Sequence, residues 1–569
     1  MGIAANNCAC MLMNHPPDTA LADPLPTVPN STGSTIDQRR LVAALANPAR
    51  FGRGCTGVTV LETHISYVLL TGRHAYKLKK AVDLGFLDFT TLASRRFFCE
   101  QELRLNRRLA PAIYLDVVAI TGTIDDPVLG GSGPALEYAV KMREFPQEAL
   151  ASRVLARDQL AAEDIDALAS RVAAFHAASD RTAADSAFGA PDVILRIALA
   201  NFPRLRSAAA TPVEERALAA LEAWTRSEHA ARAAAFHARQ QDGFVRECHG
   251  DLHLGNIAVI DGEVTIFDCI EFSDAMRWID VMSEVAFTAM DLQDRGHAEL
   301  SHRFVNAYLE ITGDYAGLSV LRFYLVYRAL VRAKIALLRT TQMAPCEGRT
   351  ALLRERDGYV WLAEAYVRSS APAIVIAHGV SGCGKTTLSQ ALLEQVGALR
   401  IRTDVERKRL HGLATTEGSD AAAARELYNS DATRRTYDHA LHLAGCVAAA
   451  GFVAIVDGAF LRCSQRHRFH ALAASLGIPF VIVAFSAGEA TLRRRVAERA
   501  HRGRDASDAD VGVLEHQLRT RQVLGADEMA HTVVYDAEAP LAAARSPHAW
   551  RAVVARLHVE RPAESAVEN

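Results

Sequence analysis

Two short stretches of the chain, CHGDLHLGN at 248–256 and FDCIEF at 267–272, hold polar side chains of the kinds that transfer phosphate. Asp251 can orient the hydroxyl group of an acceptor and accept its proton. Asn256 offers an amide oxygen and Asp268 a carboxylate, and Mg²⁺ in proteins prefers such oxygen ligands. Phosphoryl transfer needs a positioned carboxylate together with a metal held by oxygen ligands. The pattern therefore predicts a site at which Asp251 is the base and Asn256 and Asp268 bind magnesium.

A second stretch, GVSGCGKTT at 379–387, lies between a strand-like apolar run and a helical pattern. Glycines allow backbone N–H groups to converge on phosphate oxygens at the start of a helix. In the motif G-x-x-x-x-G-K-[ST], the lysine reaches the β- and γ-phosphates of a nucleotide and the hydroxyl binds magnesium. The residues predicted to bind a nucleotide here are Gly379, Gly382, Gly384, Lys385, Thr386 and Thr387, and Thr386 is also a candidate metal ligand.

Charged residues that suit a kinase follow this motif. The stretch LRIRTDVERKRL predicts a strand that ends at Asp404, which can receive an acceptor hydroxyl or face magnesium. Arg407 lies beyond it and can anchor an anionic acceptor. Asp457 ends the predicted strand FVAIVD and is a candidate metal ligand. Arg495 and Arg499 can close over a transferring phosphate, because guanidinium groups supply forked donors. The alternative for this arginine run is a solvated helix face.

A predicted hairpin brings the residues of the first site together. The run IAVIDGEVTIF (257–267) has strand-like halves around Asp261 and Gly262, a pair typical of a tight turn. Such a hairpin would return Asp268 beside Asn256, as one shared metal requires.

The elements around the two sites follow from periodicity. Residues 57–82 predict two strands joined by a turn at Thr71 and Gly72, and a helix follows that ends near Pro111. The strands YLDVVAI and ALEYAVKM come next, and helical patterns cover 150–240 and 280–370. From Pro372 onward strands alternate with helices, which is typical of a parallel α/β sheet.

The sequence HGDLHLGN followed by IFD resembles the catalytic and metal-binding loops of aminoglycoside phosphotransferase-like and choline-kinase-like proteins. The resemblance covers roughly residues 45–365 and implies the protein-kinase fold. It implies a strand lysine that contacts nucleotide phosphates and pairs with a helix glutamate. Lys77 and Glu102 are favoured for these roles, and Lys79 is the alternative to Lys77. It also implies that EYAVKM, 137–142, is the hinge that binds adenine.

Two features depart from that family. The segment LETHISYV stands where protein kinases carry a glycine-rich loop over the phosphates. Glu271, in DCIEF, either contacts the metal or braces the loop, and both possibilities stay open. Asp280 and Glu284 are expected to support the loop from the helix that follows.

The C-terminal part, through GVSGCGKTT, resembles small P-loop kinases of the gluconate-kinase type and, more distantly, zeta-toxin-like and polynucleotide-kinase-like proteins. The order of elements resembles bacterial fusions of the two domain types. This implies an α/β multidomain chain, with a two-lobed kinase-like α+β domain and then a P-loop domain with a parallel sheet. The expected limits are a disordered leader at 1–38, the two domains at 39–370 and 371–560, and a disordered tail at 561–569.

The bulk composition restricts the function classes. The chain has 569 residues, which is enough for two to four domains, and a formal net charge of −3, which gives no case for binding nucleic acid. No apolar run is long enough to span a bilayer, and no signal peptide is expected. The ten cysteines are scattered, so we expect a reduced, cytoplasmic protein.

These features together predict an ATP- and Mg²⁺-dependent phosphotransferase that acts on a small, hydroxyl-bearing acceptor at one or both sites. One alternative is a regulatory ATPase in which one domain binds ATP without transfer. Another is a toxin-like or polynucleotide-type kinase, although the arginine run lacks the aromatic residues that single-stranded nucleic acids stack on. The acceptor, the communication between the sites and the oligomeric state do not follow from the sequence.

Overall fold

The computed structural model of the chain describes residues 35–52, 54–85, 87–340, 347–368, 371–413, 427–502 and 509–557. The predicted tail and residues 1–34 of the predicted leader lie outside this part, and helix α1 (Thr35–Leu45) begins within the predicted leader. The chain forms two compact units. The first unit comprises Met1–Asp294 and Leu321–Val367, and the second comprises Arg295–Val320 and Arg368–Asn569. The domain limits read from the sequence stay a prediction.

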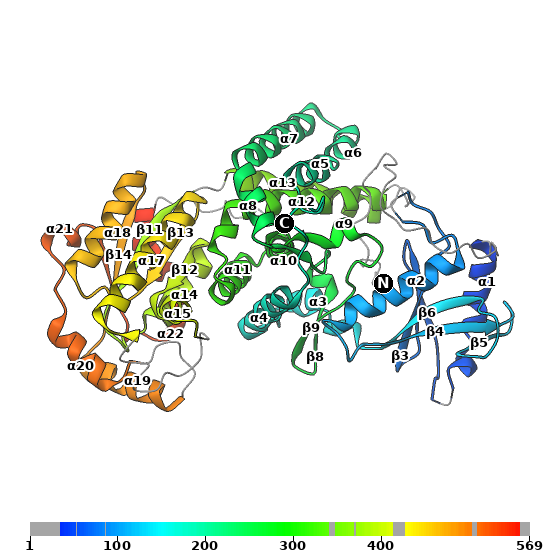
Figure 1. Cartoon of the computed structure of the whole chain (residues 1–569), viewed down its shortest axis with the longest axis horizontal. Coiled ribbons are helices and arrows are strands. Elements are labelled where there is room, and N and C mark those ends of the chain that lie inside the picture. Colours follow the sequence, from blue (N-terminus) through cyan, green and yellow to red (C-terminus); the bar gives the residue numbers. More distant parts are fainter. Residues whose placement is uncertain are drawn as a thin grey trace. The chain divides into compact units, whose positions relative to one another are not determined.

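The first unit begins with an antiparallel sheet of order β1-β2-β3-β6-β4-β5. The predicted turn at Thr71 and Gly72 joins β2 to β3, and β1 is an additional strand before them. Helix α2 (Leu92–Arg107) begins where the Thr91 hydroxyl accepts the N–H of Ser94, and it packs along β4 and β6 (Figure 1). The strands are β1 (Thr59–Glu62), β2 (Ser66–Leu70), β3 (His74–Lys79), β4 (Tyr114–Gly122), β5 (Pro127–Leu129) and β6 (Glu137–Arg143).

The rest of the first unit is mainly helical, as the two helical patterns predict. Its helices are α3 (Ala151–Leu155), α4 (Ala162–Ala178), α5 (Pro191–Leu199), α6 (Phe202–Ser207), α7 (Pro212–Ala231), α8 (Ala233–Gln241), α9 (Asp274–Arg277), α10 (Val281–Asp294), α12 (Leu318–Thr340) and α13 (Glu347–Arg368). Two small antiparallel pairs complete it. They are β7 (Val245–Glu247) with β10 (Trp278–Asp280), and β8 (Ile257–Ile260) with β9 (Glu263–Ile266).

The predicted hairpin of 257–267 is confirmed. Ile257 pairs with Ile266 and Ile260 pairs with Glu263 across β8 and β9. Asp261 and Gly262 both have left-handed backbones, with φ of 53° and 80°, which matches the twist of a two-residue hairpin.

The second unit has a five-stranded sheet of order β12-β13-β11-β14-β15, in which every pair is parallel. The predicted parallel α/β sheet is therefore confirmed. Its strands are β11 (Ala373–His378), β12 (Leu399–Arg402), β13 (Val453–Asp457), β14 (Phe480–Ser486) and β15 (Thr532–Asp536). Its helices are α14 (Lys385–Val396), α15 (Thr403–Leu410), α17 (Ser430–Ala449), α18 (Cys463–Leu476), α19 (Glu489–Arg502), α20 (Val511–Thr520), α21 (Ala526–Met529), α22 (Leu541–Ala544) and α23 (Arg551–Leu557).

Helix α11 (Ala298–Thr312) also belongs to the second unit, although α10 and α12 of the first unit flank it in sequence. It packs on α14 and β12. Asn306 Oδ1 accepts the backbone N–H of Arg400 at 2.7 Å, and His302 Nδ1 hydrogen-bonds to the Glu394 carbonyl at 2.7 Å. The helical pattern over 280–370 does not predict that this helix packs in the second unit. An amphipathic pattern shows that a helix has an apolar face, but not which core that face packs against.

None of the described helices combines the length and the apolar character that a bilayer-spanning segment needs.

Candidate active sites

The loop of residues 248–256 follows β7 and is held in place by buried side chains. Glu284, on α10, accepts the backbone N–H of Gly250 at 2.7 Å and that of His249 at 3.2 Å. His176 lies 2.9 Å from the same carboxylate. Burial raises the pKa of Glu284, but His176 and the backbone N–H groups outweigh this and lower it to about 2. Glu284 thus supports the loop as a carboxylate, as the sequence predicts.

Asp251 and Asn256 lie together within this loop. Asn256 Nδ2 donates to Asp251 Oδ2 at 3.1 Å and to the Asp251 carbonyl at 2.9 Å. Their other side-chain oxygens, Asp251 Oδ1 and Asn256 Oδ1, are buried and have no hydrogen-bond partner among the described residues. Buried polar atoms are usually hydrogen-bonded, so two neighbouring oxygens without a donor fit a metal ion or an acceptor hydroxyl.

The charge state of Asp251 suits a base. Burial by itself raises the pKa of a carboxyl, but His253, whose Nε2 lies 3.5 Å from Asp251 Oδ2, acts against it. His249 and Arg332 act in the same direction, and together they hold the pKa of Asp251 below its usual value of 3.8. The carboxylate is therefore ionised near neutral pH.

Asp268 lies just after β9 and has a left-handed backbone, with φ of 65°. Such a φ is uncommon outside glycine, and it tends to occur at functional sites. Asp268 Oδ1 lies 2.6 Å from Lys77 Nζ on β3. The hairpin therefore places Asp268 next to Lys77. The two residues must lie close together if they are to contact the same nucleotide.

Lys77 and Lys79 lie on the same face of β3, and both contact Glu102 on α2. Lys77 Nζ is 2.8 Å from Glu102 Oε1, and Lys79 Nζ is 2.7 Å from Glu102 Oε2. Their second partners differ, because Lys77 pairs with Asp268 while Lys79 pairs with Glu271. The Lys79 side chain is fully buried, whereas that of Lys77 is 10% exposed. Lys77 therefore lies at the predicted metal ligand, and Lys79 lies behind it.

Glu271 completes this buried array. Burial raises its pKa, and the ion pair with Lys79 counteracts that effect only in part. For Lys79, burial lowers the pKa, but the carboxylates of Glu102 and Glu271 raise it above the usual value. In this structure the ion pair with Lys79 ties the segment of Glu271 to β3, which fits the second role that the sequence left open, a brace for the loop.

The prediction that residues 137–142 form an adenine-binding hinge is wrong. These residues lie in β6, which pairs with β3 on one side and β4 on the other. Within the doubly paired part, Ala139–Met142, the backbone N–H and C=O groups serve the two ladders, so the strand cannot bond a base along its edge.

In the second unit, the predicted phosphate-binding loop joins β11 to α14. Lys385 Nζ donates to the carbonyls of Gly379 and Val380 at 2.9 and 3.1 Å, so the lysine lies over its own loop. A Cβ on Gly382, whose φ is 82°, would lie 2.9 Å from the Leu492 carbonyl, so this position requires glycine. Gly384, also left-handed, is the N-cap of α14.

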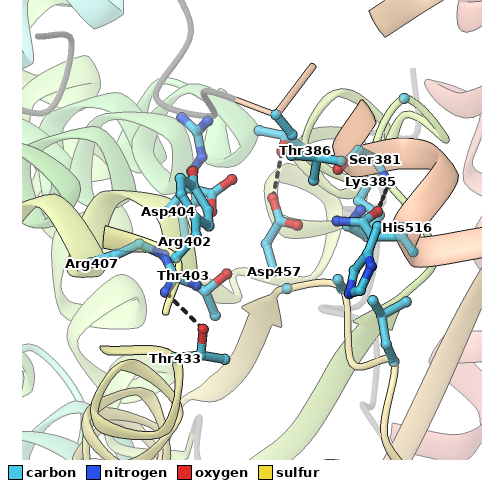
Figure 2. A pocket seen from close by; sticks show the side chains of 18 of the residues that line it. Ser381, Lys385, Thr386, Arg402, Thr403, Asp404, Arg407, Thr433, Asp457 and His516 are labelled. Atoms are coloured by element: carbon cyan, nitrogen blue, oxygen red, sulfur yellow. Dashed lines mark hydrogen bonds between the residues drawn. The ribbon is translucent and has the colours of Figure 1, made fainter. Parts of the chain in front are cut away.

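Thr386 and Asp457 form the contact that a metal site at this loop needs. Thr386 Oγ1 donates to Asp457 Oδ2 at 2.5 Å (Figure 2). Asp457 is the last residue of β13, as predicted, and its side chain points toward the loop. In other P-loop proteins a threonine and an acid in these positions hold Mg²⁺. A hydroxyl and a carboxylate are suitable oxygen donors for that ion.

Asp404 does not end a strand, contrary to the prediction. The ladder between β12 and β13 stops at the pair Arg402–Asp457, because β13 itself ends there. Asp404 then lies in the first turn of α15, where a negative charge is favourable. It still lines the same cavity as the loop, and it lies with Arg402 and Arg407 across that cavity from Thr386 and Lys385 (Figure 2).

This cavity has a volume of about 1360 Å³, which is large enough for a nucleotide and a second molecule. Arg495 and Arg499 line it from α19, and each also binds a backbone carbonyl, of Ala537 and Ala509 respectively. Predicted site residues from the phosphate-binding loop, α15, β13 and α19 therefore line one cavity.

The sequence gives no signal for several other residues of this cavity. Gln517, on α20, accepts the backbone N–H of Ser381 in the phosphate-binding loop at 2.7 Å. Arg434, Arg462 and Arg468 line the cavity from α17 and the start of α18. Isolated arginines and glutamines on helices have many ordinary roles, so no motif could have identified them.

Comparisons with known proteins match two separate parts of the chain. Residues 95–324 match the family model of the phosphotransferase enzyme family, and residues 374–524 match that of an AAA domain. The chain therefore joins a kinase-like phosphotransferase domain to a P-loop domain, as the sequence predicts. These matches support a phosphotransferase.

The uncharacterized proteins Rv2004c of Mycobacterium tuberculosis (strain ATCC 25618 / H37Rv) and Mb2027c of Mycobacterium bovis are similar over most of their length. Each is 31% identical over 451 residues, which cover 79% of this chain and 88% of the relative. The chain belongs to the same family as these proteins.

Solved structures share less with the chain. A choline/ethanolamine kinase family protein from Mesorhizobium loti is 12% identical, covers 59% of this chain and 95% of its own, and has a TM-score of 0.34. An ethanolamine kinase from Plasmodium vivax is 8% identical and covers 54% and 81%, with a TM-score of 0.33. A gluconokinase from Sinorhizobium meliloti 1021 is 22% identical and covers 33% and 93%, with a TM-score of 0.24.

Proposed function

We propose that the protein is an ATP- and Mg²⁺-dependent phosphotransferase with two separate transfer sites, each acting on a small acceptor that carries a hydroxyl group. The observation that carries this proposal is that Asp251 Oδ1 and Asn256 Oδ1 are buried and have no hydrogen-bond partner among the described residues. Asp251, the proposed base, is also ionised. Buried side-chain oxygens usually accept a hydrogen bond, so two such atoms without a donor in one loop favour a ligand there.

In the first unit, each residue has a distinct part. Lys77, held by Glu102, binds the nucleotide phosphates, and Asp251 takes the proton from the acceptor hydroxyl. Asn256 and Asp268 would hold Mg²⁺, which supplies positive charge that neutralises phosphate oxygens during transfer. Lys79 shares Glu102 with Lys77, and Glu271 binds Lys79, so these two buried residues support the array without binding the nucleotide.

In the second unit, Lys385 and the backbone of the glycine-rich loop, with Thr387 at the start of α14, bind the nucleotide phosphates. Thr386 and Asp457 would hold Mg²⁺ there. Asp404 receives the acceptor hydroxyl from across the cavity, and Arg407 attracts an anionic acceptor. Arg495 and Arg499 stabilise the charge on the transferring phosphate.

The proposal is tested by ATP turnover with and without a bacterial metabolite extract, with new phosphorylated products identified by mass spectrometry. The proteins to compare are wild type, Asp251→Asn, Lys385→Ala and the double variant. Asp261→Asn is the matched control for the first change, because Asp261 is exposed in the β8–β9 turn and asparagine tolerates its left-handed backbone.

We expect each single change to remove a different product and the double variant to be inactive. If Asp251→Asn changes nothing while Lys385→Ala abolishes all turnover, the first unit is a binding module and the two-site proposal fails. If labelled phosphate appears on nucleic acid ends instead of metabolites, the small-molecule acceptor is wrong for the second unit.

A further inference from the structure

A cluster of metal-binding side chains lies in the second unit, apart from the large cavity that holds the phosphate-binding loop. Cys463 and His467 are four positions apart on α18, so they lie on the same face of that helix. Glu528, on α21, is close to both, and the three ligand atoms lie within 4.8 Å of one another. None of these three residues lines the cavity, so the cluster is separate from the proposed magnesium ligands Thr386 and Asp457.

The distances around His467 match those of a tetrahedral zinc site. Cys463 Sγ lies 3.5 Å from His467 Nε2, and Asp527 Oδ2 lies 3.3 Å from the same nitrogen. Zinc binds sulfur at about 2.3 Å and nitrogen or oxygen at about 2.0–2.2 Å, so two ligands of a tetrahedral ion are about 3.3–3.6 Å apart. Asp527 is exposed, so its side chain can turn toward an ion held by the other residues.

Glu528 keeps an acceptor position for such an ion. Its Oε1 accepts a hydrogen bond from Arg466 Nε at 2.6 Å, and its Oε2 accepts from Arg466 Nη2 and from the Gly525 N–H, both at 2.8 Å. A carboxylate has about four acceptor positions, so one remains on Oε1. With zinc bound, a thiolate at Cys463 and the carboxylates of Asp527 and Glu528 would balance the charges of the ion and of Arg466.

The two segments that carry these ligands are held together by other contacts. Arg466 is fully buried, and besides Glu528 it donates to the carbonyls of Phe460 and Gln522, at 2.9 and 3.3 Å. Gln522 Oε1 accepts the backbone N–H of Cys463 at 2.7 Å. Ligands that are already in place lose little conformational freedom when they bind, which favours affinity.

Another group of a histidine, a cysteine and a glutamate lies in the first unit, at His176, Cys248 and Glu284. All three residues are buried, and the Cys248 thiol donates to the Ile279 carbonyl at 3.5 Å. Glu284 binds His176 and two backbone N–H groups of the loop at 248–256. This group therefore supports the loop and is a weaker candidate for a metal.

We propose that the second unit binds Zn²⁺ through Cys463 Sγ, His467 Nε2, Glu528 Oε1 and Asp527 Oδ2. On binding, the S–H bond of Cys463 breaks, its proton passes to solvent, and the sulfur bonds to the metal. Mg²⁺ competes poorly for such a site, because it favours an octahedron of oxygen ligands. The bound ion would link α18 to α21, and it is independent of phosphate transfer at either proposed active site.

The test uses the full chain with Co²⁺ and Zn²⁺ as probes and Mg²⁺ in excess. Co²⁺ bound by a thiolate absorbs strongly in the near ultraviolet, and Co²⁺ bound by oxygen ligands alone does not. A spectrophotometric titration with Co²⁺ therefore detects this site and not the proposed magnesium sites. Zn²⁺ is then added to displace the Co²⁺, which gives its affinity.

The variants are Cys463→Ser and His467→Ala, and the matched controls are Cys446→Ser and His442→Ala. Cys446 and His442 have the same spacing on α17, with Sγ and Nε2 3.7 Å apart. Among the described residues, however, no carboxylate completes a cluster with them.

We expect wild type to show the near-ultraviolet absorption with Co²⁺ and to lose it when Zn²⁺ is added. Cys463→Ser should abolish the absorption. Cys463→Ser and His467→Ala should each weaken Zn²⁺ binding by about 100-fold or more, since loss of an outer-shell partner alone costs about 10- to 100-fold. Both control proteins should match wild type. No absorption in wild type, its retention in Cys463→Ser or its loss in Cys446→Ser would overturn the proposal.

Alkylation of the wild-type protein decides the question if Cys463→Ser fails to fold. Cys463 and Cys446 are both partly exposed, so iodoacetamide can reach each of them. Zn²⁺ should suppress the alkylation of Cys463 and leave that of Cys446 unchanged, as measured by peptide mass spectrometry, because a metal-bound sulfur is a poor nucleophile. Equal alkylation of Cys463 with and without Zn²⁺ would show that the thiol does not bind the ion.

Discussion

Lys77 and Asp268 form an ion pair with Nζ 2.6 Å from Oδ1, although they are 191 positions apart in the chain. The pair joins β3 to the segment after β9, and Glu102 approaches the same ammonium group at 2.8 Å. Lys79 also contacts Glu102, at the other carboxylate oxygen, but its second partner is Glu271. The two lysines therefore share one partner and differ in exposure and in their second partner.

We predict that Lys77→Met and Lys79→Met fail in different ways. Lys77→Met should lower kcat/KM for ATP at the first site by about 100-fold or more, because it removes a phosphate contact. Lys79→Met should mainly lower the free energy of unfolding, by about 3–5 kcal/mol, because it leaves Glu102 and Glu271 buried without their shared cation. Steady-state kinetics and urea unfolding of each protein separate these effects.

Lys80→Met is the control for both changes, because the ion pair of Lys80 is with the half-exposed Glu62 and its ammonium group lies over the Tyr67 ring, 4.8 Å from the centroid. It should leave both activity and unfolding nearly unchanged. If Lys79→Met, and not Lys77→Met, lost activity while keeping its stability, the roles of the two lysines would be reversed.

We predict that Glu284 makes the protein sensitive to acid. Its folded-state pKa is lowered from 4.5 to about 2, so the carboxylate stabilises the fold at pH values above the unfolded pKa. This contribution, on the order of 3 kcal/mol, is lost as the pH falls through the range from about 5 to about 2. Wild type should therefore be more stable than Glu284→Gln at neutral pH, and the difference should shrink as the pH falls.

The measurement is urea unfolding of both proteins at several pH values. Glu263→Gln, at an exposed position of β9, is the control and should follow wild type throughout. A difference between wild type and Glu284→Gln that stays constant across this pH range would show that the pKa of Glu284 is not lowered in the folded protein.

We predict that the hydroxyl of Thr386 is needed for turnover at the second site. Thr386→Ala should lower kcat there by about 100-fold or more, because the hydroxyl that contacts Asp457 is lost. Thr386→Ser keeps the hydroxyl and should retain most of the activity. The assay is ATP turnover in an Asp251→Asn background, which leaves only the second site. Equal activity of the alanine and serine proteins would contradict a metal-binding role.

We predict that the arginines of α19 that line the cavity are needed for turnover at the second site, and that an arginine of α19 outside the cavity is not. Arg495→Ala and Arg499→Ala should each lower kcat of the second site by about 10- to 1,000-fold, because both residues line the cavity in which we propose that the phosphates bind. Arg493→Ala is the matched control, since Arg493 pairs with Glu515 on the neighbouring helix and is half-exposed. If all three proteins kept full activity, the run would be a solvated helix face, as the alternative interpretation holds.

Much of the local structure could be predicted from the sequence. The hairpin turn at Asp261 and Gly262, the start of α2 after Thr91 and the loop before α14 depend on neighbouring residues, and their dihedral preferences and caps act within a few positions. Both domain types were also predicted, because HGDLHLGN with IFD and GVSGCGKTT are each compact enough to be recognised in one sequence. The roles of individual site residues stay predictions.

The sequence by itself thus determined the kinds of domain and the residues whose side chains suit phosphate transfer. Both follow from side-chain chemistry and from turns formed by residues that are adjacent in the chain. Only the tertiary structure decided which lysine meets Asp268, that Glu271 binds Lys79, that Asp404 lies in the first turn of a helix, and that α11 packs in the second unit. The physical reason is that these outcomes depend on contacts between residues distant in the chain. Adjacent residues allow more than one outcome at each of these positions. The burial of charged side chains and the point at which a neighbouring strand ends decide which outcome the fold adopts.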